Sequence, residues 1–214
     1  MDELREALRA DFEGYEEVHD LCLAAPKYGN DDDTVDQYVR HFAHFVVTEH
    51  DKYKTLTGGK MMPSWYPVSS NVPQGMTVAA LPSGRKAGKP LADGVSPNQG
   101  TDRLGPTAVL RSVGKFQHED LDGGTLLNVK FEPHVVAGEE GLQRFAAYLR
   151  AFLDLPIYHV QFNVVDEKTL RCAQAQPDEY RSLLIRVAGY SAFVVELHED
   201  IQNDIISRTS NTVL

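Results

Sequence analysis

The carboxy-terminal half of the chain alternates between helical and strand patterns, and this alternation limits the possible folds more than any other feature of the sequence. The patterns predict helices over 106–116, 138–153, 166–174, 177–184 and 199–208, and strands over 125–131, 159–165 and, as a strand or a turn entering a strand, 188–196. Such alternation indicates an α/β protein. Polarity alternates along Tyr158–Val165, so we expect a strand with two different faces and not one buried in a doubly covered sheet.

The amino-terminal part, residues 1–56, reads as a helical segment. Apolar residues recur every three or four positions over 2–23, which predicts one helix that ends before Pro26. The turn formed by residues 29–33 ends in aspartates that can cap a second helix over 33–50.

Residues 57–106 are rich in Gly, Pro, Ser and Asn, with one short strand expected over 77–81. A disordered linker is a poor interpretation, because Met61, Met62, Trp65 and Tyr66 are interleaved with these turn-forming residues. We therefore expect a long ordered loop, which in proteins is usually functional.

Composition excludes several classes of protein. The formal net charge of −10 argues against a nucleic-acid-binding face, which needs clustered Lys and Arg. No apolar run approaches the ~20 residues that cross a bilayer, so no membrane segment is expected. With only Cys22 and Cys172, and no signal-peptide pattern, the cytoplasm is the simplest compartment. No phosphate loop, dinucleotide motif, calcium loop or zinc spacing occurs, so we expect no bound cofactor and no metal.

Two short motifs near the carboxy terminus carry the chemistry. Arg186-Val187-Ala188-Gly189-Tyr190, followed by Ile205-Ile206-Ser207-Arg208-Thr209, resembles the signature of glycyl radical enzymes. The resemblance implies that an activating enzyme removes one hydrogen atom from the α-carbon of Gly189. Glycine suits this role because an α-carbon radical is planar and a Cβ would crowd it, and because glycine tolerates unusual backbone angles. We expect Arg186 and Tyr190 to support the loop without reacting.

Further blocks of the chain resemble the same family. They are Pro26–Asp33, Pro63–Asn71, Leu81–Gly88, Leu91–Pro97, Gly105–Leu110 and His159–Asn163. They look most similar to the branch that contains choline trimethylamine-lyase, glycerol dehydratase and isethionate sulfite-lyase. That branch implies a ten-stranded α/β barrel. Residues 57–214 would form its carboxy-terminal part, with a glycine radical domain over about 90–214, and a partner chain would complete it.

The resemblance also points to a substrate-binding wall. Trp65 and Tyr66 lie in a block similar to an active-site wall of the related dehydratases and lyases, which makes Tyr66 the best candidate for substrate contact. An aromatic residue that simply packs in an ordered loop accounts for Tyr66 equally well.

The family's catalytic cysteine and glutamate have no counterpart here. Full enzymes of the family are several times longer, and their cysteine lies upstream of the region that this chain resembles. Cys22 falls on the apolar face of the first expected helix and Cys172 within another, so we expect both to be buried as small hydrophobic residues. Neither fits the catalytic role.

Three interpretations of the missing parts follow. In the first, the chain is the small subunit of a split enzyme, inactive without a larger subunit that carries the cysteine and the glutamate; Met1 and a capped helix are a sensible gene start. In the second, it is a spare part that repairs an oxygen-damaged full-length enzyme. In the third, it is a remnant that only binds a partner. The length of the resemblance favours the split subunit, and the intact radical motif argues against a remnant.

The resemblance implies a reaction scheme. A radical S-adenosylmethionine activase, which carries an iron–sulfur cluster, would install the radical on Gly189. Gly189 would pass it to the partner's cysteine for C–X bond cleavage in a small substrate, as in a lyase or dehydratase. Dioxygen would cleave the backbone at Gly189, so the resemblance implies an anaerobic setting.

Overall fold

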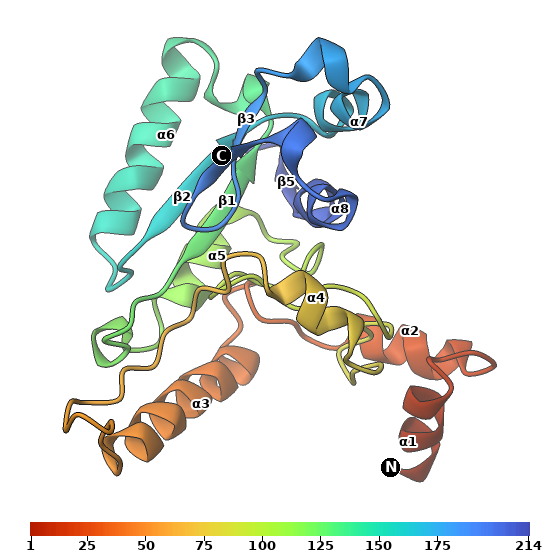
Figure 1. The fold of residues 1–214 in the computed structure, drawn as a ribbon, viewed down its shortest axis with the longest axis vertical. Helices are drawn as coiled ribbons and strands as arrows, with labels where there is room; N and C mark the ends of the chain where they lie inside the picture. Colours follow the sequence, from red (N-terminus) through yellow and green to blue (C-terminus); the bar gives the residue numbers. More distant parts are fainter.

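The computed structural model describes residues 1–214 and has the mixed α/β architecture expected from the sequence (Figure 1). The α-helices are α1 (Asp2–Arg9), α2 (Glu16–Ala24), α3 (Asp33–Asp51), α4 (Asn71–Met76), α5 (Pro106–Val113), α6 (Gly138–Leu153), α7 (Glu167–Ala175) and α8 (Glu199–Ser207). The strands are β1 (Leu127–Phe131), β2 (Val160–Val164), β3 (Leu184–Arg186), β4 (Ser191–Phe193) and β5 (Ser210–Asn211). Four short 3₁₀ helices span His118–Asp120, Pro133–Val136, Pro177–Tyr180 and Val194–Glu196. None of the helices combines the length and the apolar character that a membrane crossing requires.

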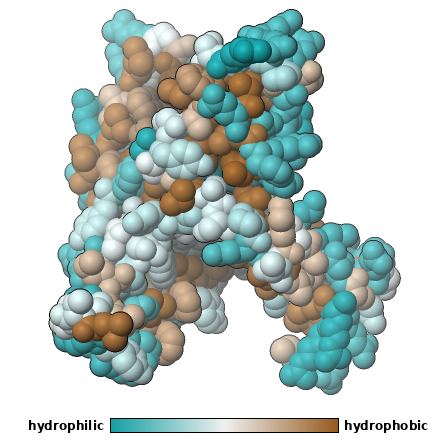
Figure 2. All heavy atoms as spheres, in the orientation of Figure 1, coloured by the Kyte–Doolittle hydropathy of each residue, from teal (hydrophilic) through white to brown (hydrophobic).

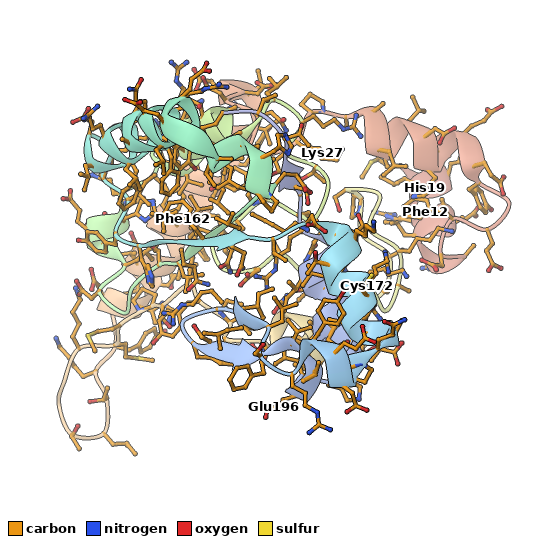
Figure 3. The ribbon with its side chains drawn as sticks, turned by 90° about the horizontal axis from the view of Figure 1, so that it is seen from above. Phe12, His19, Lys27, Phe162, Cys172 and Glu196 are labelled. Carbon is orange, nitrogen blue, oxygen red and sulfur yellow. The ribbon has the colours of Figure 1, made fainter.

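A parallel sheet with strand order β2-β1-β5 forms the centre of the molecule. The chain leaves β1, crosses through α6 and returns in β2, and the two strands pair in register from Leu127 with Val160 to Phe131 with Val164. The two faces of this sheet differ in polarity. Phe131 contacts Phe145 and Tyr148 of α6. Phe162 contacts the same two residues and points toward this helix (Figure 3).

The opposite face of the sheet is polar and buried. It presents Asn128 and Lys130 from β1 and Gln161 and Asn163 from β2; Lys130, Gln161 and Asn163 are each less than 10% exposed. The expectation of a two-faced strand is therefore confirmed. Burial, however, is greater on the polar side of β2 than on its apolar side, because the polar side chains bind the loops that cross the sheet.

An antiparallel hairpin, β3–β4, lies on this polar face and belongs to a second core. That core combines apolar side chains of the hairpin with those of α7 and α8, including Leu170, Ile185, Val187 and Ile205. The first and larger core lies between α5, α6 and the apolar face of β1. The hairpin is thus held between the sheet and two helices.

Several expected elements differ from the observed ones. The single helix expected over 2–23 is two helices, because Asp11, Phe12 and Gly14 adopt positive φ angles and turn the chain. The two helices and the loop between them extend away from the sheet, and Phe12 stacks on His19 within this arm (Figures 1 and 3).

The strand expected over 77–81 is absent. Residues 71–76 form α4 instead, and the segment after it is irregular, since the Arg85 guanidinium binds the carbonyls of Gly75 and Ala79 and so replaces strand pairing. The helix expected over 177–184 is a 3₁₀ turn, Pro177–Tyr180, that leads into β3. Of residues 188–196 only Ser191–Phe193 form a strand, and β5 was not expected at all.

Candidate functional site

Gly189 lies at the tip of the β3–β4 hairpin. The turn closes through a hydrogen bond of 2.9 Å from the Val187 nitrogen to the Tyr190 carbonyl. Gly189 has a φ of +81°, a conformation that L side chains rarely adopt, and it is exposed. A Cβ at this position would meet nothing closer than the Leu126 side chain at 3.9 Å. The backbone conformation, and not crowding, therefore favours glycine here.

The Gln161 side chain reaches the turn from the polar face of β2. Its oxygen accepts a hydrogen bond of 3.1 Å from the Gly189 backbone N–H and another of 2.9 Å from Nε of Arg186. Its nitrogen donates to the Val187 carbonyl at 3.3 Å. One carboxamide on a paired strand thus holds both sides of the glycine turn.

Asn163, two residues further along β2, holds the base of the same hairpin. Its oxygen accepts a bond of 2.9 Å from the Arg186 backbone nitrogen, and its nitrogen donates at 2.7 Å to the Arg186 carbonyl. This reciprocal pair imitates strand pairing, and it docks β3 on the sheet where no backbone ladder joins them.

Arg208, from the second motif, holds the turn from the other side. Its Nη1 donates at 2.9 Å to the Val187 carbonyl, while Nη2 lies 3.2 Å from an Asp93 oxygen and 3.0 Å from an Asp204 oxygen. The Asn128 side chain donates a hydrogen bond to Asp93 and accepts one from Gln161. The contacts form a closed ring through Val187, which gives a physical reason why the two carboxy-terminal motifs occur together.

The environment of this ring is buried and charged. Burial raises the pKa of Asp93, while the neighbouring Arg208 guanidinium opposes the shift. Lys130 is only 3% exposed and donates to the carbonyls of Ile205 and Ile206; burial lowers its pKa to about 8. A cavity of about 40 Å³ lies among these residues. Its polar lining and size suit a few ordered waters, which would reach the unpaired Oδ1 of Asp93 and Nε of Arg208.

Trp65 and Tyr66 lie beside this site. Trp65 stacks on Phe42 and packs at a tilt against Phe116, and its backbone pairs with that of Gly124 and Leu126. The Tyr66 side chain is 45% exposed and lines an open groove of about 660 Å³ with Phe42 and Trp65. Leu126 lies between the two regions, because its backbone binds Trp65 and its side chain would lie 3.9 Å from a Cβ added at Gly189.

The structure thus brings three of the five residues singled out from the sequence together at the turn, since Arg186 and Tyr190 lie in the same hairpin as Gly189. Trp65 and Tyr66 line the neighbouring groove instead. Sequence reasoning missed Gln161, Asn163 and Asp93 as site residues, although each lies in a block that resembled the family.

Neither cysteine takes part in the hydrogen bonds and ion pairs that hold the glycine turn. Cys22 packs against the small core of the amino-terminal arm, and Cys172 lies on α7 (Figure 3). Both are half-buried, not buried as expected, because each helix is covered on one side only.

Two protein-family models match this chain. The model described as glycine radical matches residues 91–195, and the model described as pyruvate formate lyase-like matches residues 1–75. The isethionate sulfite-lyase of Nitratidesulfovibrio vulgaris is 43% identical over all of this chain and 26% of its own length. The trans-4-hydroxy-L-proline dehydratase of Clostridioides difficile is 41% identical over 99% of this chain and 27% of its own length.

Solved structures agree with these relatives. The B12-independent glycerol dehydratase of Clostridium butyricum, in its glycerol-bound form, superposes with a TM-score of 0.95 at 46% identity, over 99% of this chain and 27% of that protein. A glycyl radical enzyme of Archaeoglobus fulgidus superposes with a TM-score of 0.94 at 43% identity, over 99% and 27%. The chain therefore spans about a quarter of the length of the relatives that it matches.

Proposed function

The chain belongs to the glycyl radical enzymes, of which it is a carboxy-terminal portion, and on this premise we propose that it stores a radical on Gly189 for a lyase or dehydratase reaction. The observation that carries the proposal is the turn itself: an exposed glycine with positive φ in the first motif of the family signature, held on one side by Gln161 and on the other by Arg208 of the second motif. In this assignment Arg186 and Tyr190 support the turn, and Tyr66, with Trp65 behind it, contacts the substrate.

The first step is activation. A radical S-adenosylmethionine activase would supply a carbon radical that takes one hydrogen atom from the α-carbon of Gly189. The Cα–H bond of Gly189 would break, the activase's carbon radical would gain that hydrogen atom, and Gly189 would hold the unpaired electron. The exposed position of the turn supports this step, since the α-carbon lies at the surface of this chain.

The second step is transfer to a cysteine. Gly189 regains a hydrogen atom from the thiol S–H, and the sulfur becomes the radical that attacks a C–H bond of a small substrate. Cys22 packs in the core of the amino-terminal arm and Cys172 lies on α7, and neither contacts the turn through a hydrogen bond, so we place the catalytic cysteine, with its glutamate, in the three-quarters of the relatives that this chain does not span.

We propose that this remaining part is a separate, larger subunit that completes the barrel around residues 57–214. Exposed apolar side chains beside the groove of Tyr66 support the proposal that a larger subunit packs against this chain. Tyr38, Phe42 and Phe45 on α3 are 70%, 59% and 58% exposed, and two of them line the groove of Tyr66. Figure 2 shows apolar residues reaching the surface at several places on the molecule. We propose that the same larger subunit also covers the exposed turn and so shields Gly189 from dioxygen, in an anaerobic cytoplasm.

A repair function for a damaged full-length enzyme is the alternative. The match over residues 1–75, far upstream of the glycine, favours the split enzyme, because repair of the turn alone needs only the last segment. The two functions differ in what the larger polypeptide contains. Anaerobic activity that requires this chain, together with a polypeptide that has no radical glycine of its own, supports the split enzyme. Activity restored only to a full-length relative cleaved at its own glycine supports repair.

A further inference from the structure

We propose that Gln161 is the positioning residue of the Gly189 radical: it fixes the peptide plane on the amino side of Gly189 and, through the N–H group, influences where the unpaired electron spreads. This inference rests on the proposed function, because it needs the radical to form on Gly189. It assigns a role to a side chain that lies outside both carboxy-terminal motifs.

The carboxamide of Gln161 can take only one orientation. Its oxygen faces two donors, the Gly189 N–H at 3.1 Å and Nε of Arg186 at 2.9 Å. Its nitrogen faces two acceptors, the carbonyls of Val187 and of the Asn128 side chain. Reversal would place donor against donor and acceptor against acceptor. All of the hydrogen-bonding capacity that a glutamine side chain usually uses is satisfied, so the group is rigid.

The backbone of Gly189 depends on this one contact. Gly189 is exposed, lies outside both strands of the hairpin, and makes no other hydrogen bond through its N–H or carbonyl. Gln161, in contrast, is 6% exposed and lies in the strand that pairs with β1 along its whole length. The hydrogen bond from Gly189 to Gln161 therefore fixes the tip of the turn relative to the sheet.

The chemistry of the radical makes this contact consequential. An α-carbon radical of glycine delocalises over its own amide nitrogen and carbonyl only to the extent that these groups are coplanar with the radical centre. A hydrogen bond from the N–H to a carboxamide oxygen holds the nitrogen side of that plane, and it polarises the N–H so that more electron density is available on nitrogen. Loss of the contact should change the spin density on the α-carbon and its coupling to the remaining α-hydrogen.

The test uses this chain with the cysteine-bearing polypeptide and the activase, under anaerobic conditions. Gln161→Met removes all four hydrogen bonds at nearly the same size, whereas Gln161→Glu keeps the oxygen that accepts from Gly189. Gln202→Met is the matched control, since Gln202 also binds two backbone carbonyls, of Val194 and Leu197, away from the turn. Circular dichroism verifies that each variant is folded.

We expect Gln161→Met to alter the α-hydrogen splitting of the paramagnetic resonance doublet and to shorten the radical half-life severalfold. Gln161→Glu should keep the wild-type splitting, and Gln202→Met should change neither quantity. A doublet with unchanged splitting and half-life in Gln161→Met overturns the inference alone. A wild-type complex without a doublet overturns the proposed function, and this inference with it.

A measurement on the wild-type chain covers the case in which Gln161→Met does not fold. Amide hydrogen exchange by nuclear magnetic resonance should show the Gly189 N–H protected at least tenfold relative to Gly138, an exposed glycine that also has positive φ and open space around it but makes no hydrogen bond through its N–H. Equal exchange at the two glycines contradicts the contact.

Discussion

The side-chain oxygen of Gln161 lies 3.1 Å from the backbone nitrogen of Gly189, so a buried side chain of β2 and an exposed turn 28 positions later meet through one hydrogen bond. The Val187 carbonyl, in the same turn, receives bonds from both Gln161 and Arg208. The glycine is therefore presented at the surface without being free to move independently of the sheet.

Removal of the Arg208 guanidinium should destabilise the fold strongly. Arg208→Met leaves the buried carboxylates of Asp93 and Asp204 without their cation, which costs on the order of 3–5 kcal/mol when a buried ion pair is broken. The midpoint of urea unfolding measures this loss. Arg181→Met is the control, because the exposed Arg181–Asp178 pair contributes at most about 1 kcal/mol. Equal effects of the two substitutions would argue against the ring of contacts around the turn.

Lys130 should make stability depend on alkaline pH. Burial lowers its folded pKa to about 8, below its ordinary value of 10.5. Between these two values the unfolded chain binds more protons than the folded one, so the free energy of unfolding should rise with pH across this window, by on the order of 3 kcal/mol. The contribution is lost as the pH falls through about 8.

Urea unfolding at a series of pH values from 7.5 to about 10.5 measures this slope. Lys130→Met should remove it, whereas Lys168→Met, which changes an exposed lysine on α7, should retain it. A wild-type slope that is identical in Lys130→Met would show that Lys130 is charged in the folded protein.

The apolar face of α3 should be required for association and not for folding. Phe42 is 59% exposed, so Phe42→Asp should leave the unfolding midpoint nearly unchanged. If the larger polypeptide covers the groove, the substitution should weaken binding by about 2 kcal/mol or more, as for a central aromatic contact. Titration calorimetry with that polypeptide measures the loss. Leu142→Asp, at a 60% exposed position on α6, is the control, and an equal loss in both variants would contradict a specific role of this face.

The substrate contact proposed for Tyr66 should depend on its hydroxyl group. Tyr66→Phe keeps the ring in the groove and removes the hydrogen bond, which should lower kcat/KM about tenfold, equivalent to roughly 1.4 kcal/mol. Tyr53→Phe, at another exposed tyrosine, provides the comparison. Steady-state kinetics of the assembled enzyme that are unchanged by Tyr66→Phe would favour the packing interpretation.

The sequence was informative where a local pattern determines the structure. Helix α6, the existence of strands β1 and β2 and the two-faced character of β2 follow from periodicity, and α6 has the bounds expected. The break between α1 and α2 was not predictable in the same way, because Asp11 and Phe12 adopt positive φ angles that their residue types disfavour. Segment 77–81 has strand-like composition, yet the carbonyls around it bind Arg85 from outside the segment.

The site residues, too, divide into those that a local sequence pattern predicts and those that only the folded chain brings together. Gly189 and the residues next to it were identified because they form a contiguous motif. Gln161 and Asp93 lie 28 and 96 positions from Gly189, and only the folded chain brings them to the turn. A glutamine in an alternating strand reads as a solvent-facing residue, and nothing local indicates that its polar face is the buried one.

The central claim is that the radical is stored on Gly189, and paramagnetic resonance tests it most directly. The chain, the cysteine-bearing polypeptide and the activase are combined anaerobically, with Gly100→Ala as a control for the cost of alanine at a positive φ. We predict a doublet in the wild type and in Gly100→Ala, collapse of the doublet to a singlet when the chain contains α-deuterated glycine, and no signal in Gly189→Ala. A doublet that persists in Gly189→Ala would contradict the account.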